Sequence, residues 1–322
     1  MARNESLDPA ALSALVKEKA LALGFSFVGI CHSVSEGDKE FYQWWADQGF
    51  AADMFYLRAQ KKRRRSLQEI LPGARSAVVC ALRFPGSLEN LSADETKEKG
   101  KVARYAMQDD YHGRLLPMLN ELAQFLDEQA GILPEQKSLS YVDTGAISER
   151  ALASEAGLGW IGKNAMLIHP EEGSWFWIGE VITSAELSAD EATTDHCGKC
   201  RRCIDACPTG AILEDLRAVD SRKCIAYLNI EHRGPIAKQF HKPMGNWLLG
   251  CDICQEVCPW NEHSLRHARK EIGAPPAEWL DLEEILTMKP EDFTKRFKSR
   301  AISRAKLAGL QRNAIIVKKN LE

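Results

Sequence analysis

Four cysteines in the segment CGKCRRCIDACPTGA, residues 197–211, constrain this chain more than any other feature. Their spacing is C-x2-C-x2-C-x3-C followed by proline, the spacing of bacterial ferredoxins that hold two iron–sulfur clusters. In that pattern the first three thiolates bind one cluster, and the fourth is carried by the following helix to the other cluster. A second run, C-x2-C-x3-C-P, lies at residues 251–259, and Cys224 is the candidate for its missing first ligand.

This interleaving predicts which thiolates share a [4Fe–4S] cluster. The first cluster is expected to take Cys197, Cys200, Cys203 and Cys258. The second is expected to take Cys207, Cys224, Cys251 and Cys254. A pair of zinc sites is the alternative, but zinc usually binds two separated C-x2-C pairs, which the run from residue 197 fits poorly.

The remaining composition indicates a cytosolic protein. Eight of its ten cysteines lie between residues 197 and 258, and a reducing compartment favours metal ligation over disulfides. The N-terminus has neither a signal-peptide core nor a twin-arginine pair, and no apolar run approaches the roughly 20 residues of a membrane span. Cys31 and Cys80 lie in strand-like runs and are expected to be core residues.

Three segments are expected along the chain. Residues 1–185 alternate strand-like and helical runs, which predicts an α/β (α+β) domain. Residues 186–270 hold the ferredoxin-like module, and residues 271–322 are helical. The expected strands are 25–30, 76–84, 101–106, 138–143 and 174–183. The expected helices are 8–23, 36–48, 114–130, 147–156, 280–288, 290–299 and 301–319, the first capped by Asp8.

Clusters of this kind transfer electrons but carry out no substrate chemistry alone, so the first 185 residues must hold a partner or a substrate. Four segments, at residues 102–119, 141–170, 227–236 and 309–316, together resemble the epoxyqueuosine reductases. The resemblance covers nearly the whole chain. It implies a cobalamin-binding N-terminal domain, a layout shared with reductive dehalogenases. It also implies reduction of epoxyqueuosine to queuosine in a tRNA anticodon stem-loop, with electrons from a flavodoxin or ferredoxin.

Asp143, in the sequence YVDTG, matches the proton donor of that family. The residues give independent but weaker support, since a carboxyl at the end of an apolar strand is expected to be partly desolvated and therefore protonated near neutral pH. The alternative is that Asp143 caps the helix that follows Thr144.

The resemblance also implies a set of cobalamin contacts. The glycine-rich stretch 157–164 permits close backbone approach to a bulky ligand, although it follows a helix and so does not fit a dinucleotide-binding fingerprint. His112 is not expected to bind cobalt, because Leu115 replaces the glycine of a D-x-H-x-x-G motif. Ala106 stands where some family members have cysteine. The expected contacts are Arg104, Tyr105, Ala106, Tyr111, His112, Ser148, Arg150, Trp160, Lys163, Asn164 and Leu167.

Basic residues are unevenly distributed despite a net charge of −3. Residues 61–65 read KKRRR, and residues 293–321 hold nine Lys or Arg and no Asp or Glu. Both stretches are candidates for phosphate contacts, with a solvated helix face as the alternative for the first. Residues 304–320 resemble the start of a HEAT-like repeat. Longer family members continue beyond this point, so this member is either naturally short or truncated.

Several alternatives stay open from sequence. The tryptophans of WFWI, residues 175–178, are expected either in the core or against the corrin ring. Residues 231–233 are expected to lie near the active site. A reductive dehalogenase would usually carry a twin-arginine signal and would leave the basic C-terminus unexplained. A non-catalytic electron carrier would bind clusters but no corrinoid. The leading interpretation is a monomeric cytoplasmic enzyme.

Overall fold

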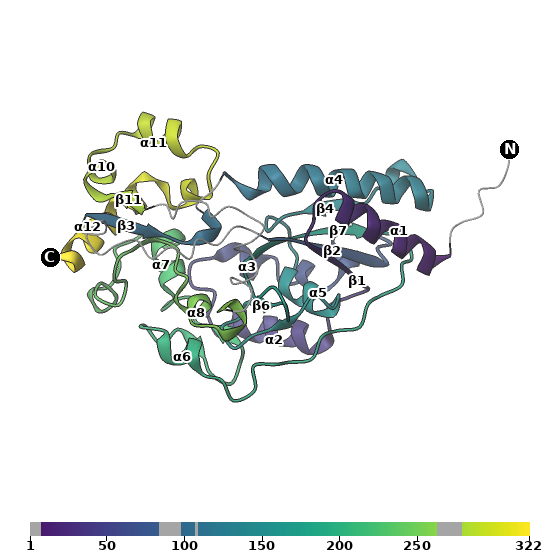
Figure 1. The fold of residues 1–322 in the computed structure, drawn as a ribbon, viewed down its shortest axis with the longest axis horizontal. Coiled ribbons are helices and arrows are strands. Elements are labelled where there is room, and N and C mark those ends of the chain that lie inside the picture. Colours follow the sequence, from purple (N-terminus) through teal and green to yellow (C-terminus); the bar gives the residue numbers. More distant parts are fainter. Residues whose placement is uncertain (1–7, 84–97, 107–108, 263–278) are drawn as a thin grey trace.

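The computed structural model describes residues 8–83, 98–106, 109–262 and 279–322. A four-stranded antiparallel sheet lies at the centre of the N-terminal part (Figure 1). Its order is β1 (Phe27–Cys31), β2 (Ser76–Arg83), β7 (Phe176–Thr183) and β4 (Leu139–Tyr141). The register pairs Val28 with Cys80 and Cys80 with Gly179. The mixed α/β fold predicted for this part of the chain is confirmed.

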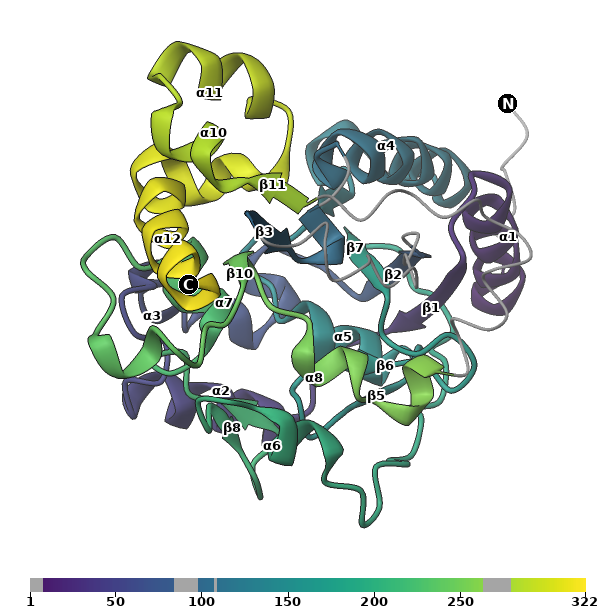
Figure 2. The same ribbon diagram turned by 60° about the vertical axis from the view of Figure 1, so that its left-hand side comes forward.

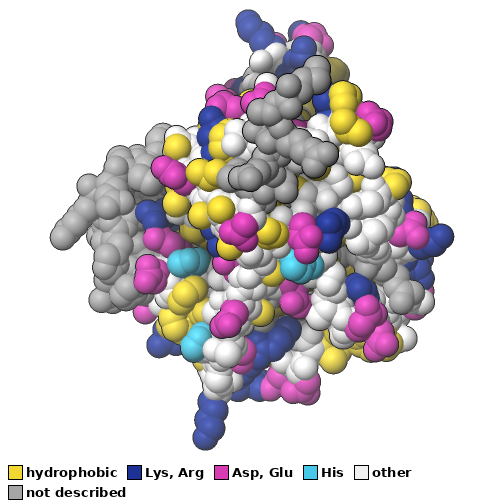
Figure 3. Space-filling view, turned by 90° about the vertical axis from the view of Figure 1, so that its right-hand side faces the viewer, with side chains coloured by type: hydrophobic (Ala, Val, Ile, Leu, Met, Phe, Trp, Pro, Cys, Tyr) yellow, Lys and Arg dark blue, Asp and Glu magenta, His cyan; other side chains and the backbone are white. Residues whose placement is uncertain are grey.

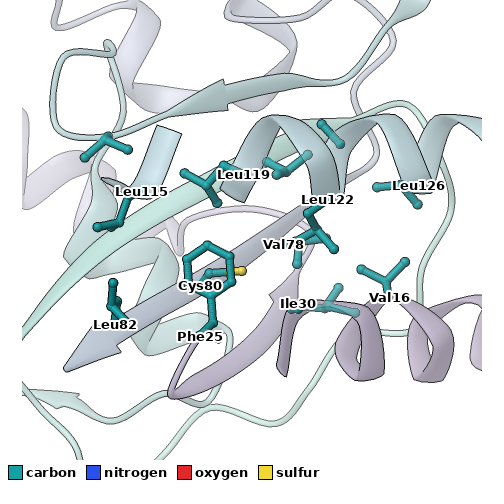
Figure 4. Close-up of a cluster of buried hydrophobic side chains, with 14 of the residues drawn as sticks. Val16, Phe25, Ile30, Val78, Cys80, Leu82, Leu115, Leu119, Leu122 and Leu126 are labelled. Carbon is teal, nitrogen blue, oxygen red and sulfur yellow. The ribbon is translucent and has the colours of Figure 1, made fainter. Parts of the chain in front are cut away.

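Helices cover both faces of this sheet. Helices α1 (Pro9–Ala22) and α4 (Tyr111–Ala130) pack on one face through an apolar layer that includes Val16, Leu119 and Leu122 (Figure 4). Helix α5 (Glu149–Glu155) packs on the other face. Cys80 and Cys31 are buried in these two layers, as expected for small apolar side chains.

Capping residues fix where the first and fourth helices begin. Asp8 accepts hydrogen bonds from the amides of Ala10 and Ala11, so the predicted cap of α1 is confirmed. Asp110 caps α4 by accepting from the amide of His112. The helix therefore begins at Tyr111, three residues earlier than expected, which places Tyr111 and His112 in its first turn.

A second sheet joins distant parts of the sequence (Figure 2). Strand β3 (Lys99–Val102) lies between β10 (Trp247–Leu249), which is parallel to it, and β11 (Trp279–Asp281), which is antiparallel. The strand expected over 101–106 is thus only partly correct. It ends at Val102 and a 3-10 turn follows at Arg104–Ala106, because the amide of Arg104 donates to the Asp252 carboxylate instead of to a strand.

The C-terminal helices pack on this second sheet. They are α10 (Leu282–Thr287), α11 (Pro290–Phe297) and α12 (Lys306–Leu321), and their core includes Val102 and Leu248. One strand from each of the three expected segments therefore contributes to a single sheet and its core.

Short elements make up the remainder of the described chain. Helices α2 (Glu36–Asp47) and α3 (Phe55–Ala59) lie between β1 and β2 in the sequence, and β5 (Trp160–Ile161) pairs with β6 (Leu167–Ile168). The cysteine-rich part contains α6 (Arg202–Ala206), β8 (Ile212–Leu213), β9 (Ala218–Val219), α7 (Ile225–Ile230) and α8 (Ile253–Glu256). Within the described ranges, no helix combines the length and apolar character needed to span a membrane.

Candidate functional site

Four cysteine thiols line a hollow of about 340 Å³ beside the β5–β6 hairpin. They are Cys197, Cys200, Cys203 and Cys258. The pKa of the Cys203 thiol is raised to about 11, chiefly by burial, with smaller contributions from the charges of the other three thiolates. Within the described ranges, no three His, Cys, Asp or Glu side chains gather closely enough for a single ion. The four thiols instead surround a space.

Side chains of the hairpin hold the loops of this cysteine group. The indole Nε1 of Trp160 donates to Cys197 Sγ at 3.4 Å. Lys163 Nζ donates to the carbonyls of Gly198 and Cys200 at 2.8 and 2.9 Å, and Asn164 Nδ2 donates to the carbonyl of Cys254 at 3.3 Å. These contacts fix the position of the cysteine loops against the N-terminal domain.

The other four cysteines form an adjacent group. Burial raises the pKa of Cys251 to about 12, with smaller contributions from the nearby charges of Cys224 and Cys207. Burial also raises the pKa of Cys254, and the charges of Cys224, Cys251 and Cys203 add to it. Since Cys203 belongs to the first group, the two groups are neighbours. Thiols this buried become thiolates only with compensating positive charge, which suits metal ligation.

A third cluster surrounds Asp143, which follows β4 and has a left-handed backbone with φ of 44°. Tyr111 Oη donates to Asp143 Oδ2, and His112 Nε2 lies 2.9 Å from Asp143 Oδ1. The other ring nitrogen of His112 lies 2.6 Å from Asp110 Oδ1. The first turn of α4 thus carries two of the side chains that contact Asp143.

These contacts set the protonation state of His112. Its pKa is raised to about 9, chiefly by the hydrogen bond to Asp143, with burial opposing and Asp110 assisting. His112 is therefore a cation near neutral pH and donates from both ring nitrogens. Tyr111 lies against Trp177, with ring centroids 5.6 Å apart and planes 14° apart. Burial, followed by the charge of Asp143, raises the pKa of Tyr111, so its hydroxyl remains a donor.

Comparison with known proteins assigns the chain to a family. Residues 64–144 match the family model for epoxyqueuosine reductase QueG, and residues 196–261 match the 4Fe-4S double cluster binding domain. Epoxyqueuosine reductase of Gloeobacter violaceus is 38% identical over 310 residues, 94% of each chain. That of Vibrio cholerae is 33% identical, over 98% of this chain and 85% of its own. This chain belongs to the epoxyqueuosine reductase family.

Solved structures of epoxyqueuosine reductases have the same fold. A crystal structure of one with an epoxyqueuosine-modified tRNA-Tyr stem loop superposes with a TM-score of 0.85 at 29% identity, covering 97% of this chain and 82% of that one. The Bacillus subtilis epoxyqueuosine reductase, with its catalytic aspartate loop swung out of the active site, has a TM-score of 0.83 at 28% identity and the same coverage.

The side chain of Asp143 is 44% exposed in the turn after β4, so it is only partly removed from solvent. It does not cap α5, whose N-cap position is Ser148, and its carboxylate bonds to Tyr111 and His112 instead. The His112 imidazolium holds a proton 2.9 Å from Asp143 Oδ1.

Glu149, the first residue of α5, is a site residue that the sequence analysis missed. Its carboxylate accepts a hydrogen bond from the backbone amide of Asp143. Burial and the charge of Asp143 raise the pKa of Glu149 to about 7. Glu149 lies six residues beyond Asp143 in the same segment, but no spacing rule links a side chain to a backbone amide across an irregular turn.

The expected cobalamin contacts do not all lie in one place. Tyr105 lies against Tyr111 in the Asp143 cluster, with ring centroids 6.4 Å apart. Trp160, Lys163 and Asn164 lie with the cysteines instead. Two of the others bond to protein groups: Arg104 to Asp252 and Glu256, and Arg150 to the Ala165 carbonyl. Ser148 lies at the start of α5, and Ala106 and Leu167 are buried in the core.

The glycines of residues 157–164 are explained by packing of the protein against itself. A Cβ on Gly159 or Gly162 would collide with Ile168, and one on Gly157 would lie 2.6 Å from the carbonyl oxygen of Glu191. Gly157 also has φ of 76°. Close approach of a ligand is therefore not the reason for these glycines.

The tryptophans of residues 175–178 pack in the core. Trp175 is 1% exposed, with the Arg104 guanidinium 4.8 Å from its ring centroid, and Trp177 is 6% exposed against Tyr111. The core alternative for these two residues is confirmed.

Many basic side chains make contacts within the protein. Lys61 pairs with Asp47, Lys62 with Glu69, and Arg64 turns inward. In the C-terminal segment, Arg296 pairs with Glu284 and Lys318 with Glu283. The face in Figure 3 intersperses basic with acidic side chains. These ion pairs reduce the charge that the two basic stretches present to a phosphate backbone.

Residues 231–233 join the C-terminal segment to the N-terminal part. Glu231 pairs with Arg304 at 2.7 Å, and His232 Nδ1 lies 3.1 Å from Asp53 Oδ2. Arg233 donates to the carbonyls of Ala305 and Arg304. The charges of both Asp143 and Glu231 act on Tyr105, so this junction lies beside the Asp143 cluster.

Proposed function

We propose that this chain reduces epoxyqueuosine to queuosine in the anticodon stem-loop of a tRNA, using two [4Fe–4S] clusters and cobalamin. The observation that carries the proposal is the Tyr111–His112–Asp143 cluster, in a chain whose relatives are epoxyqueuosine reductases. One such relative was crystallised with an epoxyqueuosine-modified tRNA stem loop.

The reaction consumes two electrons and two protons. Both carbon–oxygen bonds of the epoxide break, a carbon–carbon double bond forms, and the oxygen leaves as water. Asp143 is the proposed donor to the departing oxygen, and it takes the proton that it passes on from the His112 imidazolium through their 2.9 Å contact. Tyr111 orients the other carboxylate oxygen. The roughly half-exposed carboxyl is accessible to a substrate.

The proposed cluster ligands follow the two thiol groups. Cys197, Cys200, Cys203 and Cys258 would hold one cluster, and Cys207, Cys224, Cys251 and Cys254 the other. Two observations support this assignment. The first four thiols line one hollow, and within each group the charge of one thiolate raises the pKa of another. The charge of Cys203 acts on Cys254, and this proximity of the two groups suits electron transfer from cluster to cluster.

The residues near Asp143 would contact a bound cobalamin, and His112 would not bind its cobalt. Both ring nitrogens of His112 are engaged by carboxylates, which leaves neither lone pair for a metal. Cobalamin, when bound, supplies a strongly reducing cobalt centre. The residues proposed to contact it are Tyr105, Tyr111 and His112, from the group around Asp143, with Ser148 and Arg150 from the following segment.

The partners complete the proposal. A flavodoxin or ferredoxin would supply electrons to a monomer in the cytoplasm, where tRNA is modified. Contact with the tRNA is assigned to the basic stretch of residues 293–321, which runs from the end of α11 through α12. Arg300 and Arg304 lie at their junction, and Arg304 is close enough for the charge of Asp143 to act on it.

Incubation of the anaerobic holoprotein with epoxyqueuosine tRNA, cobalamin and a reductant tests this function. Mass spectrometry of the digested nucleosides is expected to show loss of one oxygen, and omission of cobalamin is expected to prevent it. A non-catalytic electron carrier would give no queuosine in either arm, and its visible spectrum would not change on addition of cobalamin.

A further inference from the structure

Arg64, in the middle of the basic stretch 61–65, points toward the loop that carries Asp143. Its guanidinium donates from Nη1 to the carbonyl of Ile147 and from Nη2 to the carbonyl of Gly145, the latter at 3.1 Å. Nη2 also lies 3.3 Å from Gln60 Oε1, which helps fix the side chain. The sequence analysis offered only phosphate contact or a solvated face for this stretch, and Arg64 fits neither.

The loop over residues 143–148 needs such support. Asp143 has φ of 44°, a left-handed conformation that residues with a side chain rarely adopt. A hollow of about 210 Å³ lies between the segment that includes Arg64 and Leu67 and the one that includes Ile147 and Leu152. The two hydrogen bonds of Arg64 tie the loop to its neighbour across this boundary.

Glu149 supports the same loop from its other end by accepting from the amide of Asp143. Arg64 acts two and four residues beyond Asp143, so the two side chains restrain both ends of the turn. A guanidinium is suited to this task, since its planar fork spans two carbonyls at once.

We propose that Arg64 is a positioning residue that holds residues 145–147 so that the carboxylate of Asp143 remains in contact with Tyr111 and His112. The inference rests on the proposed function of Asp143. It assigns to one member of the basic stretch a role in catalysis that needs no contact with RNA.

Three variants test the role of Arg64. Arg64→Gln removes the fork and the charge, Arg64→Lys keeps the charge but not the fork, and Arg63→Gln removes the same charge from an exposed neighbour. We expect Arg64→Gln to lower kcat by roughly 10- to 100-fold with KM for tRNA nearly unchanged, since small displacements of a catalytic group have effects of this size. Arg64→Lys should recover part of kcat, and Arg63→Gln should leave it unchanged.

The second readout is the titration of His112, followed by NMR of histidine-labelled holoprotein with oxidised clusters and assigned with His112→Gln. Loss of the Asp143 contact should bring the pKa of His112 down from about 9 toward its ordinary value near 6.5 in Arg64→Gln. Loss of a nearby positive charge alone would raise that pKa. A decrease therefore reports movement of Asp143.

A folded Arg64→Gln protein with an unchanged His112 titration and unchanged kcat overturns the inference. A raised KM with weaker salt dependence would also overturn it, by making Arg64 an RNA contact. If Arg64→Gln does not fold, Arg64→Lys decides, because full kcat and a wild-type titration would rule out any need for the fork. An inactive wild-type protein would contradict the proposed function instead. The titration of His112 would still test whether Arg64 positions Asp143.

Discussion

At the scale of single residues, the site depends on one hydrogen-bonded chain. Asp110 holds His112, and His112 and Tyr111 hold Asp143. Asp110 and His112 are adjacent to Tyr111 in sequence, whereas Asp143 is about 30 residues away. Each residue type was visible in the sequence, but the contact between the two segments is a product of the fold.

Asp143→Asn tests the proton donor. The amide is isosteric and retains hydrogen-bonding capacity, so clusters, cobalamin and tRNA should still bind. Turnover should fall by about 10²- to 10⁴-fold, the usual contribution of a general acid. Single-turnover conversion of epoxyqueuosine tRNA measures this, and an unchanged rate would remove Asp143 from its assigned role.

His112 gives the site a pH dependence. Its folded-state pKa of about 9 exceeds the unfolded value near 6.5, so its contribution to stability is complete below pH 6.5 and is lost as pH rises through 9. The unfolding free energy of wild type relative to His112→Gln should therefore shrink between pH 7 and 10. Denaturant titrations at several pH values measure this, and a difference that grows over the same interval contradicts the assignment.

At the scale of elements, local sequence patterns predicted the bounds of several strands and helices, but they did not predict which strands pair in a sheet. The alternating and β-branched runs predict β2 and β7 closely, and Asp8 and Pro9 predict the start of α1. The neighbours of β3 could not be predicted, because both lie more than 140 residues away along the chain. Glu149 and Arg64 were missed for a related reason, since each acts on the backbone of a loop.

The C-terminal helix α12 depends on a buried amide. Asn313 is 0% exposed, and its Nδ2 donates to the carbonyls of Asn229 and Leu248 at 2.8 and 3.0 Å. Asn313→Ala leaves both carbonyls unsatisfied and should lower the unfolding free energy by about 2–4 kcal/mol. Exposed Lys319→Ala is the control and should change it by less than about 0.5 kcal/mol. Equal effects of the two variants in denaturant unfolding would contradict the anchoring role assigned to Asn313.

At the scale of the whole molecule, the cysteine spacing supplied the prediction of two iron–sulfur clusters, and the resemblance of four segments to the epoxyqueuosine reductases supplied the predicted reaction. Ligand spacing is a local property, so the first run could be interpreted without knowledge of the fold. The structure adds that the two thiol groups adjoin each other and that residues of the β5–β6 hairpin support the first.

Cys224→Ala tests the pairing of thiols. It should remove or destabilise one cluster and spare the other, so iron should fall from about eight to about four atoms per chain. The buried Cys80→Ala is the control and should retain all the iron. Iron analysis with electron paramagnetic resonance of the reduced protein measures both, and full retention of iron by Cys224→Ala would refute the assignment.

The central claim is that two iron–sulfur clusters deliver electrons through cobalamin to an epoxide on RNA. The direct measurement is the visible absorption of the pre-reduced holoprotein, freed of external reductant, when an epoxyqueuosine stem loop is added. The account predicts that the clusters are re-oxidised with cobalamin present, and that a queuosine stem loop has no such effect. Re-oxidation by the epoxide in the absence of cobalamin, or none in its presence, would contradict it.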